Sequence, residues 1–496
     1  MQLVIIVCFL IAGLVVSKFN ILIAGVFLVG APFGFMLLSK PRALFYILFL
    51  WVSLTPNFIL LFGLGYFSYV DEVLSLLLVG VLILHILMRR ATFFQNKIVA
   101  FSFFGFLFVY LSSLLWNHHE WFNGVRFFLS YGRPFVVFAY VYNFFSGEDL
   151  KRFLRALVIL IGIQWALNTL WMLNLIPHYR NYLDKSTGTF ETCATTAYFF
   201  CMVLLVVIAL FANEKNNRQK ILLGVIFVLS IVQIFFTFTN HAYFLFAFGL
   251  ASFAIVSLRK YSKIILNPHI LIGVAMFVVL FFSFEGIIRK KTHSSSLGIT
   301  TSVFQKEALH RRVDRLKYES LKYHLFDITF SGEVPEIGLF GAGPGALFST
   351  VAYRSVTPLV MRYVGSYFFS IDASSREAAS VTGHPYSAML AIIGDLGFFA
   401  LFGYGVFYFI LFSSVLRFVH SGRHESSEFP ALFEAFVPCL IFYLLAEVVW
   451  DLTSFKVISV GFWAWGALLL REMDRLKTVD SDSGRQVSVG WNVPGC

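Results

Sequence analysis

Cationic residues gather in the longest polar stretch of this chain. The segment 310–317 contains Arg311, Arg312, Arg315 and Lys317. A guanidinium group offers a planar fork of donors that matches the oxygens of a phosphate group. The residue types and their spacing therefore indicate a site for a phosphate-bearing ligand. A solvated basic helix that touches anionic lipid head groups is the alternative that spacing alone leaves open.

Two further arginines, Arg126 and Arg133, lie inside the apolar run 125–145. A charge at membrane depth is costly, so such residues usually face a cavity or a charged partner. If the run is one helix, Arg133 follows Arg126 by about two turns on the same face. We interpret both as candidates for binding the same phosphate-bearing ligand. The alternatives are that Arg126 snorkels to the membrane surface and that Arg133 forms a structural ion pair.

His384 is a candidate general base. It lies between Gly383 and Pro385, where the polar stretch meets the next apolar run. A histidine at this place could deprotonate an acceptor hydroxyl group. A structural histidine at a helix start is the alternative. Asp395, about three turns further on, is expected to cap or pair locally.

A polar segment, 186–191, precedes another apolar run and ends in Glu191. Glu191 could pair with an arginine or orient an acceptor sugar. The favoured alternative is that Thr189 caps the next helix, with Glu191 in its first turn. The five cysteines and the twelve histidines show no metal-ligand spacing, and the chain has no phosphate-binding P-loop. We therefore expect neither a metal site nor a cofactor.

The surrounding composition is that of a membrane protein. The chain is 58% hydrophobic and 13% charged, with a mean hydropathy of +0.79, whereas a soluble domain is about 25% charged. Runs of about 20 apolar residues can cross the hydrocarbon layer as helices. We predict an all-α polytopic membrane protein with about fourteen transmembrane helices. The runs lie at about 2–17, 19–38, 43–62, 70–88, 98–116, 125–145, 153–176, 192–212, 221–238, 241–258, 264–284, 387–416, 430–450 and 452–470.

Basic residues recur in every second loop between these runs. The basic loops lie at 40–42, 89–97, 151–155, 215–220, 259–263, 417–423 and 471–477. Short loops rich in Lys and Arg favour the cytoplasmic side. This alternation predicts cytoplasmic termini and an external position for the polar stretch. It also accounts for the net charge of +11 without a nucleic-acid partner.

The chain divides into four parts by hydropathy. Within the polar stretch we expect an amphipathic helix over 304–326 and a glycine turn over 338–345. The tail is polar and is expected to be disordered. The parts are N-terminal transmembrane helices at 1–284, a large external loop at 285–383, C-terminal transmembrane helices at 384–470 and a cytoplasmic tail at 471–496.

Several short motifs, in this order and topology, resemble those of the O-antigen polymerase and O-antigen ligase superfamily. The basic segment 312–317 and the glycine turn 338–345 resemble its arginine segment and its glycine-rich turn. The segments 383–386 and 394–397 resemble its histidine segment and the glycine pair that follows. Thr187-Gly188-Thr189-Phe190 resembles the entry to one of its middle spans. The chain departs from the pattern in two places, because Pro385 replaces an asparagine and His241 replaces an arginine.

The resemblance implies a GT-C-like, metal-independent inverting glycosyltransferase in the bacterial inner membrane, with its large loop in the periplasm. The donor would be a glycan on undecaprenyl diphosphate, and the acceptor another glycan. Membrane lipids and a chain-length regulator would be further partners. A ligase that transfers the glycan to lipid A core or protein is the close alternative, and a lipid-linked oligosaccharide flippase is an alternative of another class. The implied catalytic residues are His384, Arg312 and Arg315, and the implied substrate-binding residues are Arg126, Arg133, Arg311, Glu191 and His241.

Overall fold

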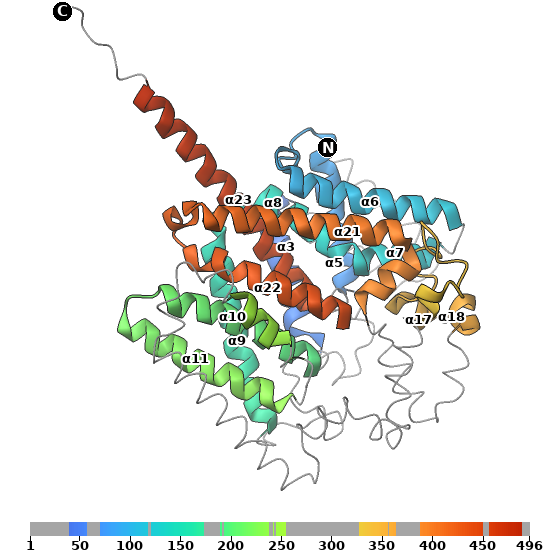
Figure 1. Cartoon of the computed structure of the whole chain (residues 1–496), viewed down its shortest axis with the longest axis horizontal. Helices are drawn as coiled ribbons and strands as arrows, with labels where there is room; N and C mark the ends of the chain where they lie inside the picture. The colour runs from blue at the N-terminus through green and yellow to red at the C-terminus, as the bar shows by residue number, and fades with distance from the viewer. Residues whose placement is uncertain are drawn as a thin grey trace, which may run out of the picture.

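The computed structural model describes residues 39–56, 70–117, 121–172, 189–190, 193–237, 242, 245–253, 327–355, 357–363, 387–449 and 456–488. These residues form helices and turns and include no β-strand (Figure 1). The elements are α3 (Pro41–Leu54), α5 (Val70–Leu87), η2 (Phe93–Gln95), α6 (Lys97–Asn117), α7 (Trp121–Tyr131), α8 (Arg133–Phe144), α9 (Asp149–Met172), α10 (Cys193–Asn213), α11 (Asn217–Phe236), α17 (Thr350–Ser355), α18 (Pro358–Tyr363), α21 (Ala388–His420), η4 (Arg423–Ser426), α22 (Pro430–Val449) and α23 (Lys456–Ser488).

Seven described helices are long and apolar enough to cross a membrane, and each coincides with one of the expected runs. They are α5, α6, α9, α10, α11, α21 and α22. This confirms the class of a multi-pass helical membrane protein. The number of fourteen spans stays a prediction, because the runs 2–17, 19–38 and 264–284 lie outside the described residues.

The run 125–145 is not the single helix that its hydropathy predicts. The chain is interrupted at Gly132, so that α7 ends at Tyr131 and α8 begins at Arg133. Pro134 has no N–H for a bond to the preceding turn. A Cβ at position 132 would lie 2.7 Å from the ring of Phe106, so the close packing of α6 requires the glycine. Arg126 and Arg133 therefore lie on different helices.

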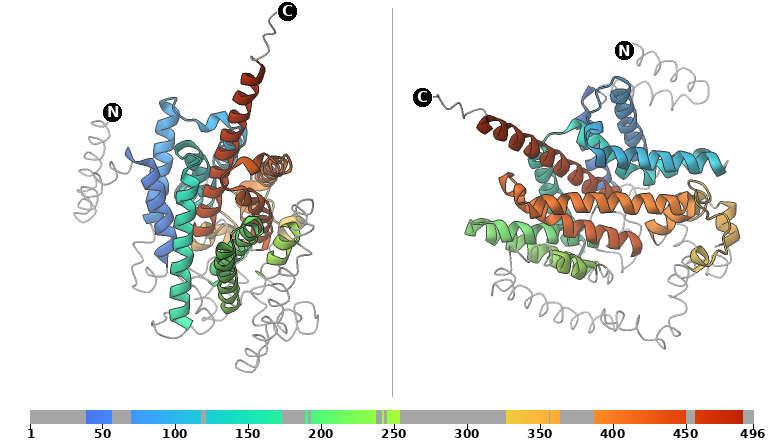
Figure 2. Two further views of the ribbon diagram at one scale, coloured as in Figure 1. Left: turned by 90° about the vertical axis from the view of Figure 1, so that its left-hand side faces the viewer. Right: turned by 45° about the horizontal axis from the view of Figure 1, so that its top comes forward.

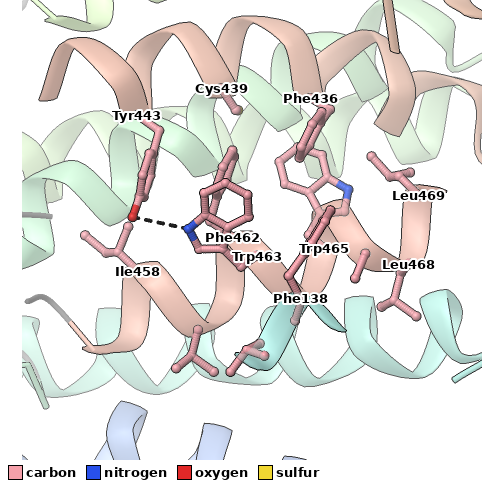
Figure 3. Packing of buried hydrophobic residues seen from close by; sticks show 14 of the residues in the cluster. Phe138, Phe436, Cys439, Tyr443, Ile458, Phe462, Trp463, Trp465, Leu468 and Leu469 are labelled. Carbon is pink, nitrogen blue, oxygen red and sulfur yellow. Dashed lines mark hydrogen bonds between the residues drawn. The ribbon is translucent and has the colours of Figure 1, made fainter. Parts of the chain in front are cut away.

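The largest hydrophobic core cluster of the described residues includes α23, which packs along α8, together with α21 and α22. Figure 3 shows Trp463 of α23 between α8 and α22. The Trp463 ring stacks on Phe407 at 5.4 Å between centroids and meets Phe138 edge-on at 5.5 Å. Its indole N–H donates to the Tyr443 hydroxyl at 3.4 Å, as a buried tryptophan requires. This cluster fixes the positions of α8 and α21, which carry the candidate site.

Polar contacts divide the described loops between two ends of the bundle. Several of the loops that the sequence groups as basic are joined by hydrogen bonds or ion pairs between distant parts of the chain. We call this the basic end. The pairs are Arg42–Asp149, Asn96–Asp474, Lys151–Glu428 and Asn213–Glu434, at 2.7 to 3.4 Å.

The opposite end is built from the C-terminal end of α6, the beginnings of α21 and α23 and the residues 338–363. We call it the turn end. Ser387 donates from its hydroxyl to the Glu447 carbonyl at 3.2 Å, which joins the start of α21 to the end of α22.

The tail after Arg471 is helical as far as Ser488, which corrects the expectation of disorder up to that residue. Figures 1 and 2 show this part of α23 projecting from the bundle. Ion pairs at the spacing i, i+3 support the helix. They join Glu472 to Arg475 at 2.7 Å and Asp474 to Lys477 at 3.3 Å.

Candidate functional site

The candidate site is built on a break inside α21. Gly397 has φ 86° and ψ −179°, which is not helical. The break removes the helical acceptors of the following N–H groups. These groups instead donate to the glycine turn, from Phe398 to the carbonyl of Gly338 at 3.3 Å and from Phe399 to that of Leu339 at 3.1 Å.

The same turn also satisfies the carbonyl groups on the other side of the break. Ala342 donates its N–H to the Gly394 carbonyl at 2.8 Å, and Gly343 donates to that of Asp395 at 3.0 Å. An unpaired backbone group inside an apolar layer costs several kcal/mol. These four bonds to the glycine turn therefore replace helical bonds that the break removes.

Glycine is required in this turn for two reasons. Gly341 and Gly345 have φ values of 67° and 78°, which L-residues with a Cβ rarely adopt. A Cβ at 341 would also lie 2.6 Å from the backbone carbon of Asp395, and one at 345 would lie 2.8 Å from the Asn123 carbonyl oxygen. The predicted turn at 338–345 is confirmed, and its glycines permit contact between two backbones.

The Asp395 side chain holds the end of the turn. It is fully buried, and its carboxyl oxygens accept N–H groups from Gly345 at 2.9 Å and from Leu347 and Phe348 at 2.8 Å each. These partners precede Asp395 by 47 to 50 residues. The expectation of a local cap or pair was wrong, because a buried carboxyl group that faces three N–H groups of the turn is better satisfied at long range.

Helices α6 and α7 complete this arrangement, which we call the turn–kink unit (residues 338–349 with 394–399). The Ser113 hydroxyl of α6 lies 2.6 Å from the Phe340 carbonyl oxygen and 3.0 Å from that of Asp395, and can donate to either. The Ser355 hydroxyl of α17 donates to the Asn123 amide oxygen of α7 at 2.9 Å. Hydrogen bonds thus join the unit to α6 and, through α17, join the segment that follows it to α7.

A buried cluster of charges lies where α5, α8 and α23 meet. The Arg133 guanidinium, 3% exposed, donates to the Asp71 carboxylate at 2.7 Å and to the Ser75 hydroxyl at 3.1 Å. The Lys456 ammonium group donates to the same carboxylate at 2.9 Å. The structural ion pair that the sequence left open for Arg133 is therefore present. With two cations and one anion, the cluster has a net charge of +1.

Arg126 is placed differently from Arg133. It is half-buried on α7, and its guanidinium carbon lies 5.5 Å from the centre of the Phe122 ring. A cation at this distance is attracted to the face of the ring. The structure therefore does not bring Arg126 into the Asp71–Arg133–Lys456 cluster.

The other predicted site residues stay predictions, since they lie outside the described part of the chain. They are Glu191, His241, Arg311, Arg312, Arg315 and His384.

Thr189, in contrast, is described and buried, and the structure does not support its role as a cap. Its N–H donates to the amide oxygen of Gln164 in α9 at 2.9 Å. Its hydroxyl donates to the Ser53 carbonyl of α3 and accepts from Gln164. Buried polar groups take whichever partner the tertiary contacts offer, and here these bonds tie the segment to α3 and α9.

Two hollows lie next to the turn–kink unit. One is a hollow of about 450 Å³ lined by Trp116, Asn117, Glu336 and residues 338–342; we call it the polar hollow because, unlike the groove described next, its lining includes a charged and an amide side chain. Glu336 pairs with Arg362 at 3.1 Å and accepts from the Tyr363 hydroxyl at 2.6 Å. Burial and this hydrogen bond raise the pKa of Tyr363 above that of a free tyrosine.

The second hollow is an apolar groove of about 350 Å³ between α6 and α21. Figure 1 shows these two helices side by side. The residues that form its walls include Phe101, Gly105, Phe399, Phe402, Gly403 and Phe407.

Sequence reasoning missed Asp71 and Lys456 as members of the site. Each lies at the edge of an apolar run, next to a loop that the charge alternation assigns to the outer side. Opposite charges at the same side of two apolar runs are a sequence signal from which the Asp71–Lys456 ion pair could have been predicted. Among the described residues, no group of His, Cys, Asp and Glu could hold a metal ion.

The chain matches no model of a known protein family and no curated protein. Its resemblance to the polymerase and ligase superfamily therefore depends on the short motifs alone.

Proposed function

We propose that this protein is a membrane glycosyltransferase that polymerises glycan repeat units carried on undecaprenyl diphosphate, in the synthesis of O-antigen, capsule or exopolysaccharide. The observation that carries the proposal is the turn–kink unit. Two of the segments that resemble the superfamily, 338–345 and 394–397, lie far apart in the sequence and are bonded to each other along both edges of the Gly397 break. Motifs that act together must meet in space, and these two meet.

The proposed reaction is an inverting displacement. A hydroxyl group of the acceptor glycan attacks the anomeric carbon of the donor. The bond from that carbon to the diphosphate oxygen breaks, and the diphosphate leaves with the electron pair. Negative charge grows on the leaving group, so fixed cationic donors stabilise the transition state selectively. In this proposal Arg312 and Arg315 hold the diphosphate, and His384 accepts the proton of the hydroxyl.

Two features of the described residues at the turn end support the proposal. The Asp71–Arg133–Lys456 cluster has one positive charge in excess, which favours an anionic ligand nearby. The polar hollow is lined in part by Asn117 and Glu336, whose amide and carboxylate groups suit sugar hydroxyls. We propose that the turn end faces the periplasm and that the basic end, with both termini, faces the cytoplasm, since Lys- and Arg-rich short loops favour that side.

The test uses the purified full-length protein in detergent with single repeats linked to undecaprenyl diphosphate. We expect a ladder of longer glycans on the lipid, measured by gel electrophoresis and mass spectrometry, and no ladder with Arg312→Ala. Detergent removes the two compartments that transport needs, so lengthening under these conditions identifies an enzyme. If the protein transfers the glycan to added lipid A core and does not lengthen it, the protein is a ligase and not a polymerase. If neither product forms, the proposal is wrong.

A further inference from the structure

The apolar groove runs along membrane-spanning helices and ends at the turn–kink unit. Its wall on α6 extends over 101–109, about 12 Å of helix. The exposed rings of Phe101, Phe108 and Phe402 lie along it. Its volume of about 350 Å³ is within the range of sites for small molecules.

The groove offers its occupant only hydrocarbon contacts over most of its length. The Ser102 hydroxyl is already used, because it donates to the Val99 carbonyl at 2.8 Å. The Tyr404 hydroxyl accepts from Tyr408 at 3.3 Å. The remaining lining side chains are Phe, Tyr, Leu, Ile, Val, Ala and Gly. A chain without polar atoms therefore fits the groove, and a polar head group does not.

The polar hollow adjoins the groove, separated from it by aromatic rings. Phe399, in the groove, lies 6.3 Å from Phe340, between ring centroids, and Phe340 lies 5.6 Å from Trp116 in the polar hollow. A hydrocarbon groove followed by a polar hollow at the end of the bundle matches a lipid with a large polar head group.

Glycines on both walls leave gaps between the rings. A Cβ at Gly403 would meet no atom within 4 Å, and one at Gly105 would lie 4.0 Å from the Phe101 ring. Such gaps accommodate the methyl branches of a prenyl chain. We propose that the groove binds the part of the polyprenyl tail next to the diphosphate of the donor lipid; this inference rests on the proposed function.

The test fills the groove without disturbing its walls. Gly403→Leu places a side chain in the groove, whereas Gly405→Leu, on the same helix, also meets no atom within 4 Å but does not line the groove. Both changes raise helix propensity by the same amount, so Gly405→Leu is the matched control. Gly105→Leu fills the groove from the opposite wall. Size-exclusion chromatography and thermal unfolding establish that each variant is folded.

The probe is geranylgeranyl diphosphate with a diazirine at the far end of its chain, and a diazirine-bearing phosphatidylcholine is the comparison lipid. With the wild type and Gly405→Leu, we expect the prenyl probe to label peptides containing 101–109 and 399–407. We expect Gly403→Leu and Gly105→Leu to bind it about tenfold more weakly, which corresponds to about 1.4 kcal/mol.

Equal labelling by the phosphatidylcholine probe would assign the groove to bulk membrane lipid and overturn the inference. The inference is also wrong if the prenyl probe labels Gly403→Leu and Gly105→Leu as strongly as the wild type. It is equally wrong if these two variants lose labelling only because their oligomeric state has changed. If the protein transfers glycan but the groove peptides are not labelled, the groove does not bind the prenyl chain, and the proposed glycosyltransferase function stands. If the groove peptides are labelled but no glycan is transferred, the proposed function is wrong, and the groove is still a binding site for a prenyl lipid.

Discussion

At the scale of single residues, Asp71 and Arg133 are not equivalent partners. Asp71 accepts from both Arg133 and Lys456, so removal of Arg133 leaves the carboxylate with a cation. Removal of Asp71 leaves the buried guanidinium with only the Ser75 hydroxyl among the bonds that the structure describes. An uncompensated buried charge is the more costly outcome.

We therefore expect Asp71→Ala to lower the free energy of unfolding by about 3–5 kcal/mol, and Arg133→Met to lower it by less. The measurement is reversible unfolding in detergent micelles, or the thermal midpoint where unfolding is irreversible. The double variant Asp71→Ala/Arg133→Met should regain part of the loss, because the unpaired guanidinium is absent. Equal losses in the two single variants would contradict the role of Lys456 as a second partner.

A second expectation concerns Asp395. An asparagine has one oxygen acceptor in place of two, so Asp395→Asn leaves at least one buried N–H of the glycine turn without its acceptor. The cost is about 1–3 kcal/mol, and the turn should open before the rest of the protein. Limited proteolysis within 327–349 measures this directly. Glu336→Gln, a partly exposed carboxylate near the same turn, is the control and should leave the cleavage rate almost unchanged.

At the scale of elements, the glycine turn and the broken α21 form one structure, because each satisfies the backbone groups of the other. We expect Gly341→Ala to break this contact, since its φ of 67° costs a residue with a Cβ about 1–2 kcal/mol and the added carbon meets the Asp395 backbone. Glycan lengthening and amide hydrogen exchange at 394–399 measure the effect.

The matched control is Gly338→Ala in the same turn. A Cβ at 338 meets no atom within 4 Å, and this glycine does not have a positive φ. It should keep wild-type exchange and activity. If both variants behave alike, the turn does not need its glycines for contact with α21.

At the scale of the whole molecule, the proposed orientation has a direct test. Leu339 at the turn end is 68% exposed, and Thr478 at the basic end is exposed. Cysteines at these two positions report the two sides of the membrane. Of the native cysteines, Cys201 and Cys439 are buried, and Cys8, Cys193 and Cys496 are replaced by serine.

A membrane-impermeant maleimide should label Leu339→Cys in intact spheroplasts and Thr478→Cys only after lysis, because basic short loops stay in the cytoplasm. Labelling is read by mass shift on a gel. The opposite labelling pattern would show that the turn end faces the cytoplasm, and a periplasmic reaction at that end would then be excluded.

The sequence by itself determined the helical membrane class, because a chain of apolar runs must satisfy its backbone groups within helices in lipid. It also determined the glycine turn, since a dense glycine segment is unsuited to a helix. These features depend on local composition alone.

Only the tertiary structure decided what the turn contacts. Asp395 reaches back to Gly345, Arg133 pairs with Asp71, and Lys456 joins them from the last described helix. The need for glycine at 132 likewise comes from the ring of Phe106 packed against it. The physical reason is that buried polar groups and close-packed glycines are satisfied by whichever partner folding brings near, and no spacing along one chain specifies that partner.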